Sequence, residues 1–203
     1  MPEIRALVLA SASPRRLELL RSLGLSVEVA PSGYGEIDPP GTAPRELAAL
    51  HARCKLDDVA ARLDARDDER AIVASDTVVD LDGVSLGKPQ DAGDARRMLG
   101  MLSGREHAVH TAFAVRLPGG RGARIVEETS TTRVRFHRLE PDEIAEYVAT
   151  GEPMDKAGAY GIQGRAAALV ESIEGDFYTV MGFPLGRFVR ALAGLGFFIP
   201  SEN

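Results

Sequence analysis

The part of the sequence that most constrains the fold is its beginning, where a short apolar segment leads directly into a polar, basic one. The apolar segment, residues 4–9, is typical of a buried strand, and leucines at helical spacing predict a helix over residues 15–23. Between them stands Ser-Ala-Ser-Pro-Arg-Arg, residues 11–16. Ser13 is suited to cap the helix and Pro14 to be its first residue, so the chain should pass from strand to loop to helix N-terminus.

The rest of the chain continues this alternation of strands and helices. Single strands alternate with helices in the first half, whereas paired strands dominate the middle. This order predicts an α/β fold with a mixed sheet flanked by helices, which can divide into two lobes around a central cleft. No linker separates independent domains, so we expect one domain over residues 1–203. The further predicted helices are residues 46–63, 92–102, 141–150 and 186–193, and the further predicted strands are residues 27–30, 71–74, 78–81, 84–86, 107–116, 124–136, 160–162 and 168–173.

Composition and charge exclude several classes of protein. The net charge of −6 argues against a broad nucleic-acid surface, which carries a basic footprint, although a few local cations are enough to hold one nucleotide. No apolar run approaches the roughly 20 residues of a membrane span, and the N-terminus lacks the pattern of a secretory signal. Cys54 is the only cysteine, which excludes an internal disulfide and a cysteine-based metal site. We therefore expect a cytoplasmic protein with neither a membrane nor a nucleic-acid partner.

The loop at residues 11–16 is a candidate phosphate site. Free backbone N–H groups and the helix dipole favour an anion at a helix N-terminus. Ser11 adds a hydroxyl donor, and Arg15 and Arg16 add forked cations that match pairs of phosphate oxygens. Local features alone are equally consistent with a well-capped surface helix. The position of the loop after the first strand, where open α/β sheets bind ligands, favours phosphate.

A second candidate site lies at residues 74–77, Ala-Ser-Asp-Thr, which are expected to end a buried strand. The carboxylate of Asp76 would face a cleft there and could hold a divalent metal, activate water, or do both. Taken alone, a turn-forming aspartate is the commoner interpretation. Lys88, between Gly87 and Pro89, could reach a phosphate, although a solvated loop lysine is the default.

The remaining candidates are weaker when each is taken alone. Gln163 lies among glycines at residues 155–164, and its amide suits the edge of a base. These glycines do not have the spacing of a dinucleotide-binding loop. Glu36 could be a metal ligand but fits an exposed loop acid equally well, and Lys55 is a single lysine on a long predicted helix.

Taken together, the motifs resemble the Maf family of nucleoside triphosphate pyrophosphatases. The resemblance extends over nearly the whole chain, and the order and spacing of the segments make it specific. It implies an elongated mixed sheet like that of inosine triphosphatase, a homodimer, and a divalent cation, Mg²⁺ or Mn²⁺. It also implies hydrolysis of a nucleoside triphosphate to the monophosphate and pyrophosphate. The segments that carry it are residues 9–16, 74–77, 86–89, 102–105, 152–164 and 175–185.

The resemblance also assigns roles to single residues. It makes Asp76 the proton acceptor and, with Glu36, a metal ligand. It makes Arg15, Thr77 and Gln163 the marks of a subfamily that acts on dTTP and UTP, and it extends to modified pyrimidine triphosphates such as 5-methyl-UTP. The residues that it assigns to phosphate binding are Ser11, Arg15, Arg16, Lys55 and Lys88.

Two other functions compete with this one. The first is a non-catalytic nucleotide-binding regulator, because the family has been linked to inhibition of septum formation. The second is a nucleotide-sugar or dinucleotide hydrolase that shares the phosphate loop. Asp76, Lys88 and the pair Asp155-Lys156 favour catalysis, since a pure binder has no need of a carboxylate beside the phosphates.

Overall fold

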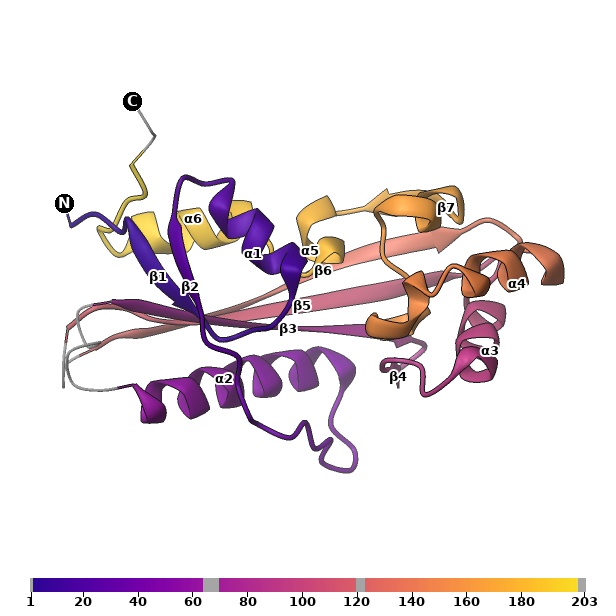
Figure 1. Cartoon of the computed structure of the whole chain (residues 1–203), viewed down its shortest axis with the longest axis horizontal. Coiled ribbons are helices and arrows are strands. Elements are labelled where there is room, and N and C mark those ends of the chain that lie inside the picture. The colour runs from indigo at the N-terminus through magenta and orange to yellow at the C-terminus, as the bar shows by residue number, and fades with distance from the viewer. Residues whose placement is uncertain (1, 64–69, 120–122, 201–203) are drawn as a thin grey trace.

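The computed structural model describes residues 2–63, 70–119 and 123–200. Seven strands form one mixed sheet in the order β2-β1-β3-β5-β6-β7, with β4 paired to β3 (Figure 1). The strands are β1 (Ala6–Leu9), β2 (Ser26–Val29), β3 (Ala71–Leu81), β4 (Val84–Leu86), β5 (Glu106–Arg116), β6 (Ile125–Phe136) and β7 (Val170–Glu174). The helices are α1 (Pro14–Arg21), α2 (Pro44–Arg62), α3 (Ala92–Leu102), α4 (Pro141–Ala149), α5 (Phe177–Met181) and α6 (Leu185–Gly194), with short 3₁₀ helices η3 (Glu152–Asp155), η4 (Ala157–Ala159) and η5 (Gly164–Ala168).

The sheet is mixed and elongated, as the sequence and the resemblance predict. Strand β1 runs parallel to β2 and β3, whereas the other described pairs are antiparallel. The long pair of β5 and β6 extends along the molecule (Figure 1). None of the described helices is long and apolar enough to cross a bilayer.

One face of the sheet is covered by α2, which lies opposite α1 and α6 (Figure 1). Its buried side chains, among them Leu47, Leu56 and Val59, pack on small residues of the strands such as Ala74 and Ala112. Small strand residues let the helix approach closely, and each buried leucine contributes about 1.5–3 kcal/mol. This packing holds α2 in place on the sheet. It therefore fixes the backbone position of any residue that α2 directs toward the sheet edge.

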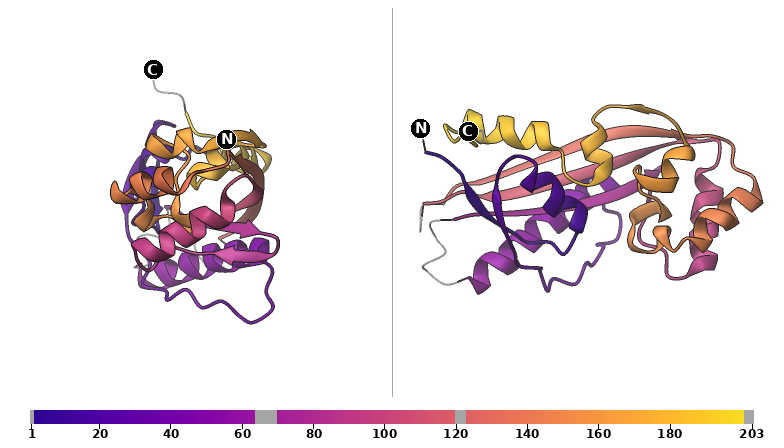
Figure 2. Two further views of the ribbon diagram at one scale, coloured as in Figure 1. Left: turned by 90° about the vertical axis from the view of Figure 1, so that its right-hand side faces the viewer. Right: turned by 45° about the horizontal axis from the view of Figure 1, so that its top comes forward.

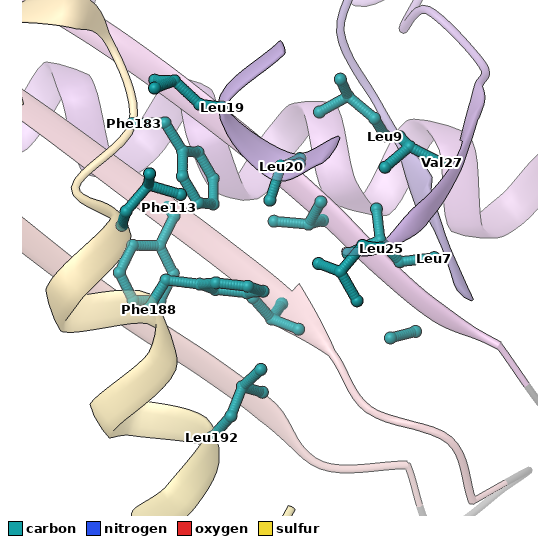
Figure 3. Close-up of a cluster of buried hydrophobic side chains, with 14 of the residues drawn as sticks. Leu7, Leu9, Leu19, Leu20, Leu25, Val27, Phe113, Phe183, Phe188 and Leu192 are labelled. Carbon is teal, nitrogen blue, oxygen red and sulfur yellow. The ribbon is translucent and has the colours of Figure 1, made fainter. Parts of the chain in front are cut away.

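The opposite face carries two hydrophobic clusters, one at each end of the sheet. The first joins α1, β1, β2 and α6 around three phenylalanine rings, Phe113, Phe183 and Phe188, whose centroids lie 5.2–5.9 Å apart (Figure 3). The second joins α3 and α4, which lie at the other end of the sheet (Figure 2), to β3, β5 and β6. It includes Tyr160. The two clusters correspond to the two lobes expected from the sequence.

Between the clusters, the same face of the sheet is polar. Alternation along β3 puts Ser75 and Thr77 on the face that carries Val73 and Val79. Together with hydroxyl residues of β5 and β6 they form a band across the sheet. We call this the hydroxyl band, made of Ser75, Thr77, Thr111, Ser130 and Thr132, all of them buried except for the partly exposed Thr77.

Two expectations about secondary structure are wrong. Residues 71–74 and 78–81 are not separate strands, because β3 is continuous and pairs with β5 through Asp76, which lies opposite Ala112. Residues 160–162 do not form a strand. Gly158 and Ala159, within η4, have φ values of 67° and 61° and turn the chain just before this segment, which the structure leaves as an irregular connection to η5.

Candidate active site

A cleft of about 490 Å³ lies along the edge of β3, between the two clusters. Strand β1 stops pairing with β3 at Val73, and β4 starts pairing at Val79, so the edge of β3 between them is open. Asp76 lies in this gap. The cleft is lined by all nine residues that the sequence analysis selected: Ser11, Arg15, Arg16, Glu36, Lys55, Asp76, Thr77, Lys88 and Gln163.

The N-terminus of α1 lies in the cleft, and the helix begins where its capping residues predict. Ser13 caps the helix and accepts from the backbone N–H of Arg16 at 3.5 Å, and Pro14 is the first helical residue. The hydroxyl oxygen of Ser11 accepts from the N–H of Ser13 at 3.2 Å and from Nη1 of Arg16 at 3.2 Å. Because both of these bonds use Ser11 as an acceptor, its own proton is left to donate to a ligand.

Arg16 is held by neutral acceptors. Its Nε donates to the carbonyl of Gly182 at 2.9 Å, and its Nη2 donates to Oγ1 of Thr77 at 3.1 Å. With the bond to Ser11, three of its donors are engaged, and none of these partners cancels its charge. Burial lowers the pKa of Arg16, an effect that the nearby negative charge of Asp76 opposes. A guanidinium remains charged in proteins, so Arg16 gives the cleft a fixed positive charge.

Asp76 and Glu36 meet at the ammonium group of Lys55. The Nζ of Lys55 lies 2.6 Å from Oδ1 of Asp76 and 2.5 Å from Oε1 of Glu36. Burial raises the pKa of Asp76, although the charges of Lys55 and Arg16 act in the opposite direction. Burial also acts to raise the pKa of Glu36, but its hydrogen bond to Lys55 and the Lys55 charge outweigh it, so that pKa is lowered. The two carboxylates therefore differ in proton affinity although they share one cation.

This pair of carboxylates fits a divalent cation. Mg²⁺ in proteins is usually bound by one or two carboxylates, with water and substrate phosphates supplying the other ligands. Among the described residues, no group of three or more His, Cys, Asp or Glu side chains could hold a metal by itself. Asp76 and Glu36 thus suit a cation that is shared with a phosphate ligand.

Glu36 is placed by a loop that is attached to α2 at two points. At one end, Oδ2 of Asp58 accepts from the hydroxyl of Ser32 at 2.8 Å and from the N–H of Gly33 at 2.8 Å. At the other, Nε2 of buried His51 lies 2.8 Å from Oδ1 of Asp38. Sequence reasoning missed His51 and Asp38, because a helix histidine and a loop aspartate thirteen residues apart carry no recognisable spacing.

The opposite side of the cleft is more exposed. Lys88 and Gln163 are exposed, and within the described part of the chain the side chain of Gln163 has no hydrogen-bond partner. Asp155 accepts from Nζ of Lys156 at 2.6 Å. Arg15 crosses the cleft, with its Nη1 lying 3.5 Å from Oδ2 of Asp155. Among the described residues, this side of the cleft is therefore held by fewer hydrogen bonds than the side that carries Arg16 and Asp76.

Comparison with known proteins gives a family model and curated relatives that match nearly the whole chain. A family model described as "Maf-like protein" matches residues 6–195. A protein of Thermus thermophilus named "dTTP/UTP pyrophosphatase" is 47% identical over 94% of this chain and 95% of its own length. A protein of Thermococcus gammatolerans with the same name is 45% identical over 97% of this chain and 100% of its own length. Among solved structures, the Staphylococcus aureus Ham1 protein matches 64% of this chain and 71% of its own, at 12% identity and a TM-score of 0.41.

Proposed function

The chain belongs to the Maf family, and we propose that it is a nucleoside triphosphate pyrophosphatase that hydrolyses dTTP and UTP to the monophosphate and pyrophosphate. The observation that carries this proposal is the buried carboxylate of Asp76, which lies at the open edge of β3 in the cleft that α1 enters. A carboxylate with a raised pKa beside fixed cations is suited to proton transfer next to a charged substrate.

The triphosphate would be bound largely by electrostatic attraction. Three features lie on one side of the cleft: the N-terminus of α1, the hydroxyl proton that Ser11 can donate to a ligand, and the positive charge of Arg16, which its neutral partners do not cancel. Lys88 adds an exposed cation on the other side. Phosphoryl transfer depends mainly on positioning and on neutralising charge, and donors that are fixed before the reaction cost no reorganisation.

Asp76 would accept a proton from the water that attacks the α-phosphorus. Its raised pKa, caused by burial, makes it a better proton acceptor than an exposed aspartate. Lys55 holds the carboxylate at 2.6 Å and so fixes its orientation. Asp76 and Glu36 would hold a divalent cation, Mg²⁺ or Mn²⁺, which when bound neutralises phosphate charge and polarises the phosphoryl oxygens.

The base would be recognised from the exposed side of the cleft. Gln163 carries an amide that can both donate and accept, and it is free of other side-chain hydrogen bonds in the described chain. Arg15 and Thr77 also line the cleft, as the resemblance requires of a dTTP and UTP enzyme. Modified pyrimidine triphosphates such as 5-methyl-UTP would enter the same position.

The direct test is release of pyrophosphate from a panel of nucleoside triphosphates in the presence of Mg²⁺ or Mn²⁺. We expect release from dTTP and UTP, with much less from ATP, GTP and CTP, and none once the cation is chelated. Absence of release from every triphosphate would contradict the proposal and favour a binding regulator. Release from 7-methyl-GTP alone would contradict the substrate assignment, and cleavage of nucleotide sugars instead would favour a different hydrolase.

A further inference from the structure

The hydroxyl band connects the cleft to the interior of the sheet. Thr77 on β3 lies directly opposite Thr111 on β5, and Thr111 lies directly opposite Ser130 on β6. Thr111 is completely buried and does not line the cleft. Its Oγ1 lies 3.0 Å from Oγ1 of Thr77 and 2.7 Å from the carbonyl oxygen of Thr179 on α5. None of the motifs in the sequence singles out Thr111.

The direction of these hydrogen bonds follows from the number of protons. A carbonyl oxygen can only accept, so the single hydroxyl proton of Thr111 is donated to Thr179. Thr111 must then accept from Thr77, whose own proton is used in that bond. Thr77 accordingly presents lone pairs to Nη2 of Arg16, which donates to it at 3.1 Å. The chain of bonds therefore runs in one direction, from Arg16 to Thr77 to Thr111 to Thr179.

We propose that Thr111 is a positioning residue for the phosphate-binding Arg16, acting through the hydroxyl of Thr77. By taking the Thr77 proton, Thr111 prevents that proton from pointing at the guanidinium and keeps a lone pair facing it. This inference rests on the proposed function, because it takes Arg16 to be a phosphate ligand. It also assigns Thr77 a second task besides its contact with the nucleotide.

The far end of the chain of bonds supports this role. Helix α5, which carries Thr179, ends at Met181 and is capped by Gly182, whose carbonyl accepts from Nε of Arg16 at 2.9 Å. By anchoring α5 through Thr179, Thr111 is linked to two of the three acceptors that orient Arg16, namely Thr77 and Gly182; the third is Ser11. The Gly182 carbonyl is also fixed from β3, where the hydroxyl of Ser75 donates to it at 3.0 Å.

A double-mutant cycle tests the proposal. We expect Thr111→Val to lower kcat/KM for UTP about tenfold, which corresponds to about 1.4 kcal/mol for one buried hydrogen bond, mainly through a higher KM. Thr77→Val should lower it by a similar factor. If Thr111 acts through Thr77, adding Thr111→Val to Thr77→Val should change kcat/KM by less than about twofold. Effects that multiply would overturn the proposal.

Two further variants separate positioning from structural support. Thr111→Ser keeps the hydroxyl and should restore kcat/KM to within about twofold of the wild type. Thr132→Val is the matched control, because Thr132 is also buried and holds α5 at its other end, with its Oγ1 2.9 Å from both the N and the O of Asp176. Thr132→Val should lower the Tm. Any effect that it has on kcat/KM should multiply with the effect of Thr77→Val. Coupling as strong as that of Thr111 would contradict the assignment. If Thr111→Val does not fold, Thr111→Ala takes its place in the cycle.

The same cycle, measured as binding, is independent of turnover. The non-hydrolysable α,β-methylene analogue of UTP is titrated by calorimetry into the wild type, the two single variants and the double variant. We expect the changes in Kd of the single variants not to multiply in the double variant. If the wild type releases no pyrophosphate but the binding cycle shows the coupling, the proposed function fails and the positioning role stands. If the wild type hydrolyses UTP but both cycles multiply, the positioning role fails and the proposed function stands. A wild type that neither binds nor hydrolyses contradicts both.

Discussion

The two sides of the cleft are built differently. On one side, which we call the fixed wall, the side chains of Ser11, Arg16, Lys55, Asp76 and Thr77 are hydrogen-bonded to one another or to the backbone. On the other side, which we call the exposed wall, Lys88, Asp155 and Gln163 face solvent. Arg15 is the link between them, through its contact with Asp155 at 3.5 Å.

This difference indicates which wall serves catalysis and which serves substrate recognition. Stabilising a transition state requires charges that are fixed in advance, which is what the fixed wall provides. Recognising a substrate that must enter and leave is compatible with solvent-exposed side chains, which is what the exposed wall provides. Substitutions in the fixed wall should therefore lower kcat or kcat/KM for every triphosphate, whereas those in the exposed wall should change substrate preference.

The largest effect is expected for Asp76→Asn, which should lower kcat at least about 10³-fold because the proton acceptor is lost. The protein should stay folded with an equal or higher Tm. Burial raises the pKa of Asp76, so its ionised form costs folding energy that the neutral amide avoids, while Glu36 still pairs with Lys55. Steady-state kinetics and calorimetry provide both measurements.

Asp80→Asn is the control for this prediction. Asp80 lies on the same strand and face as Asp76 but contacts His110, at 3.2 Å, rather than the cleft. Its amide variant should keep kcat within about threefold of the wild type, since it is a substitution away from the reacting groups. Substantial turnover by Asp76→Asn, or equal losses in both variants, would contradict the role of Asp76.

The second prediction concerns the geometry of the fixed wall rather than its charge. Arg16→Lys keeps the positive charge but cannot reach Gly182, Ser11 and Thr77 together, so kcat/KM should fall about 10²-fold. Arg21→Lys, on the exposed side of the same helix, should have no measurable effect. Normal kinetics of Arg16→Lys would show that charge alone suffices and that the hydrogen bonds of the fixed wall are dispensable.

The third prediction concerns the support behind the exposed wall. The Nε2 of His107 lies 2.7 Å from the hydroxyl of Tyr160, and burial lowers the pKa of His107 to about 4. An unfolded histidine has a pKa near 6.5. At a pH between about 4 and 6.5, His107 therefore binds a proton in the unfolded chain but not in the folded protein. The unfolding free energy should thus fall as the pH drops from about 6.5 to 4, by up to about 3 kcal/mol from this residue.

His107→Gln isolates that contribution. Glutamine keeps a polar partner for Tyr160 but does not titrate. Urea unfolding at pH 7 and at pH 4.5 should show a smaller acid loss for this variant than for the wild type. An equal loss in both proteins would mean that His107 does not carry the acid sensitivity.

The smallest effect is expected for Gln163→Ala. Loss of its amide should lower kcat/KM for UTP and dTTP about tenfold, mostly through a higher KM. The preference for UTP and dTTP over GTP should become smaller as a result. Since Gln163 is exposed, the unfolding free energy should change by no more than about 0.5 kcal/mol. Arg165→Ala, just beyond it, is the matched control. A loss in kcat with unchanged preference would place Gln163 with the fixed wall instead.

Features of the fold that depend on local chemistry were predictable from the sequence. The start of α1 follows from Ser13 and Pro14, and α3 has the predicted bounds. By contrast, α5 was missed because five residues are too short to show helical periodicity. The helix is held by Asp176, which caps it, and by Thr111 and Thr132, which come from distant strands.

The candidate site shows the same division. All nine selected residues line one cleft, although Lys55, Glu36 and Lys88 taken alone resembled ordinary surface charges. Asp76 was expected at the end of a strand but lies within β3. It faces the cleft nevertheless, because the edge of β3 is open between the last residue paired to β1 and the first residue paired to β4. Such an opening depends on the register of three strands and leaves no local signal. The homodimer, the cytoplasmic location and the divalent cation stay predictions.

The most direct test of the account is where the oxygen of water ends up. UTP is hydrolysed by the wild-type protein in ¹⁸O-labelled water with Mg²⁺, and the products are analysed by mass spectrometry. If Asp76 directs water at the α-phosphorus, one labelled oxygen should appear in UMP and none in pyrophosphate. Label in pyrophosphate, or release of inorganic phosphate in place of pyrophosphate, would contradict the account.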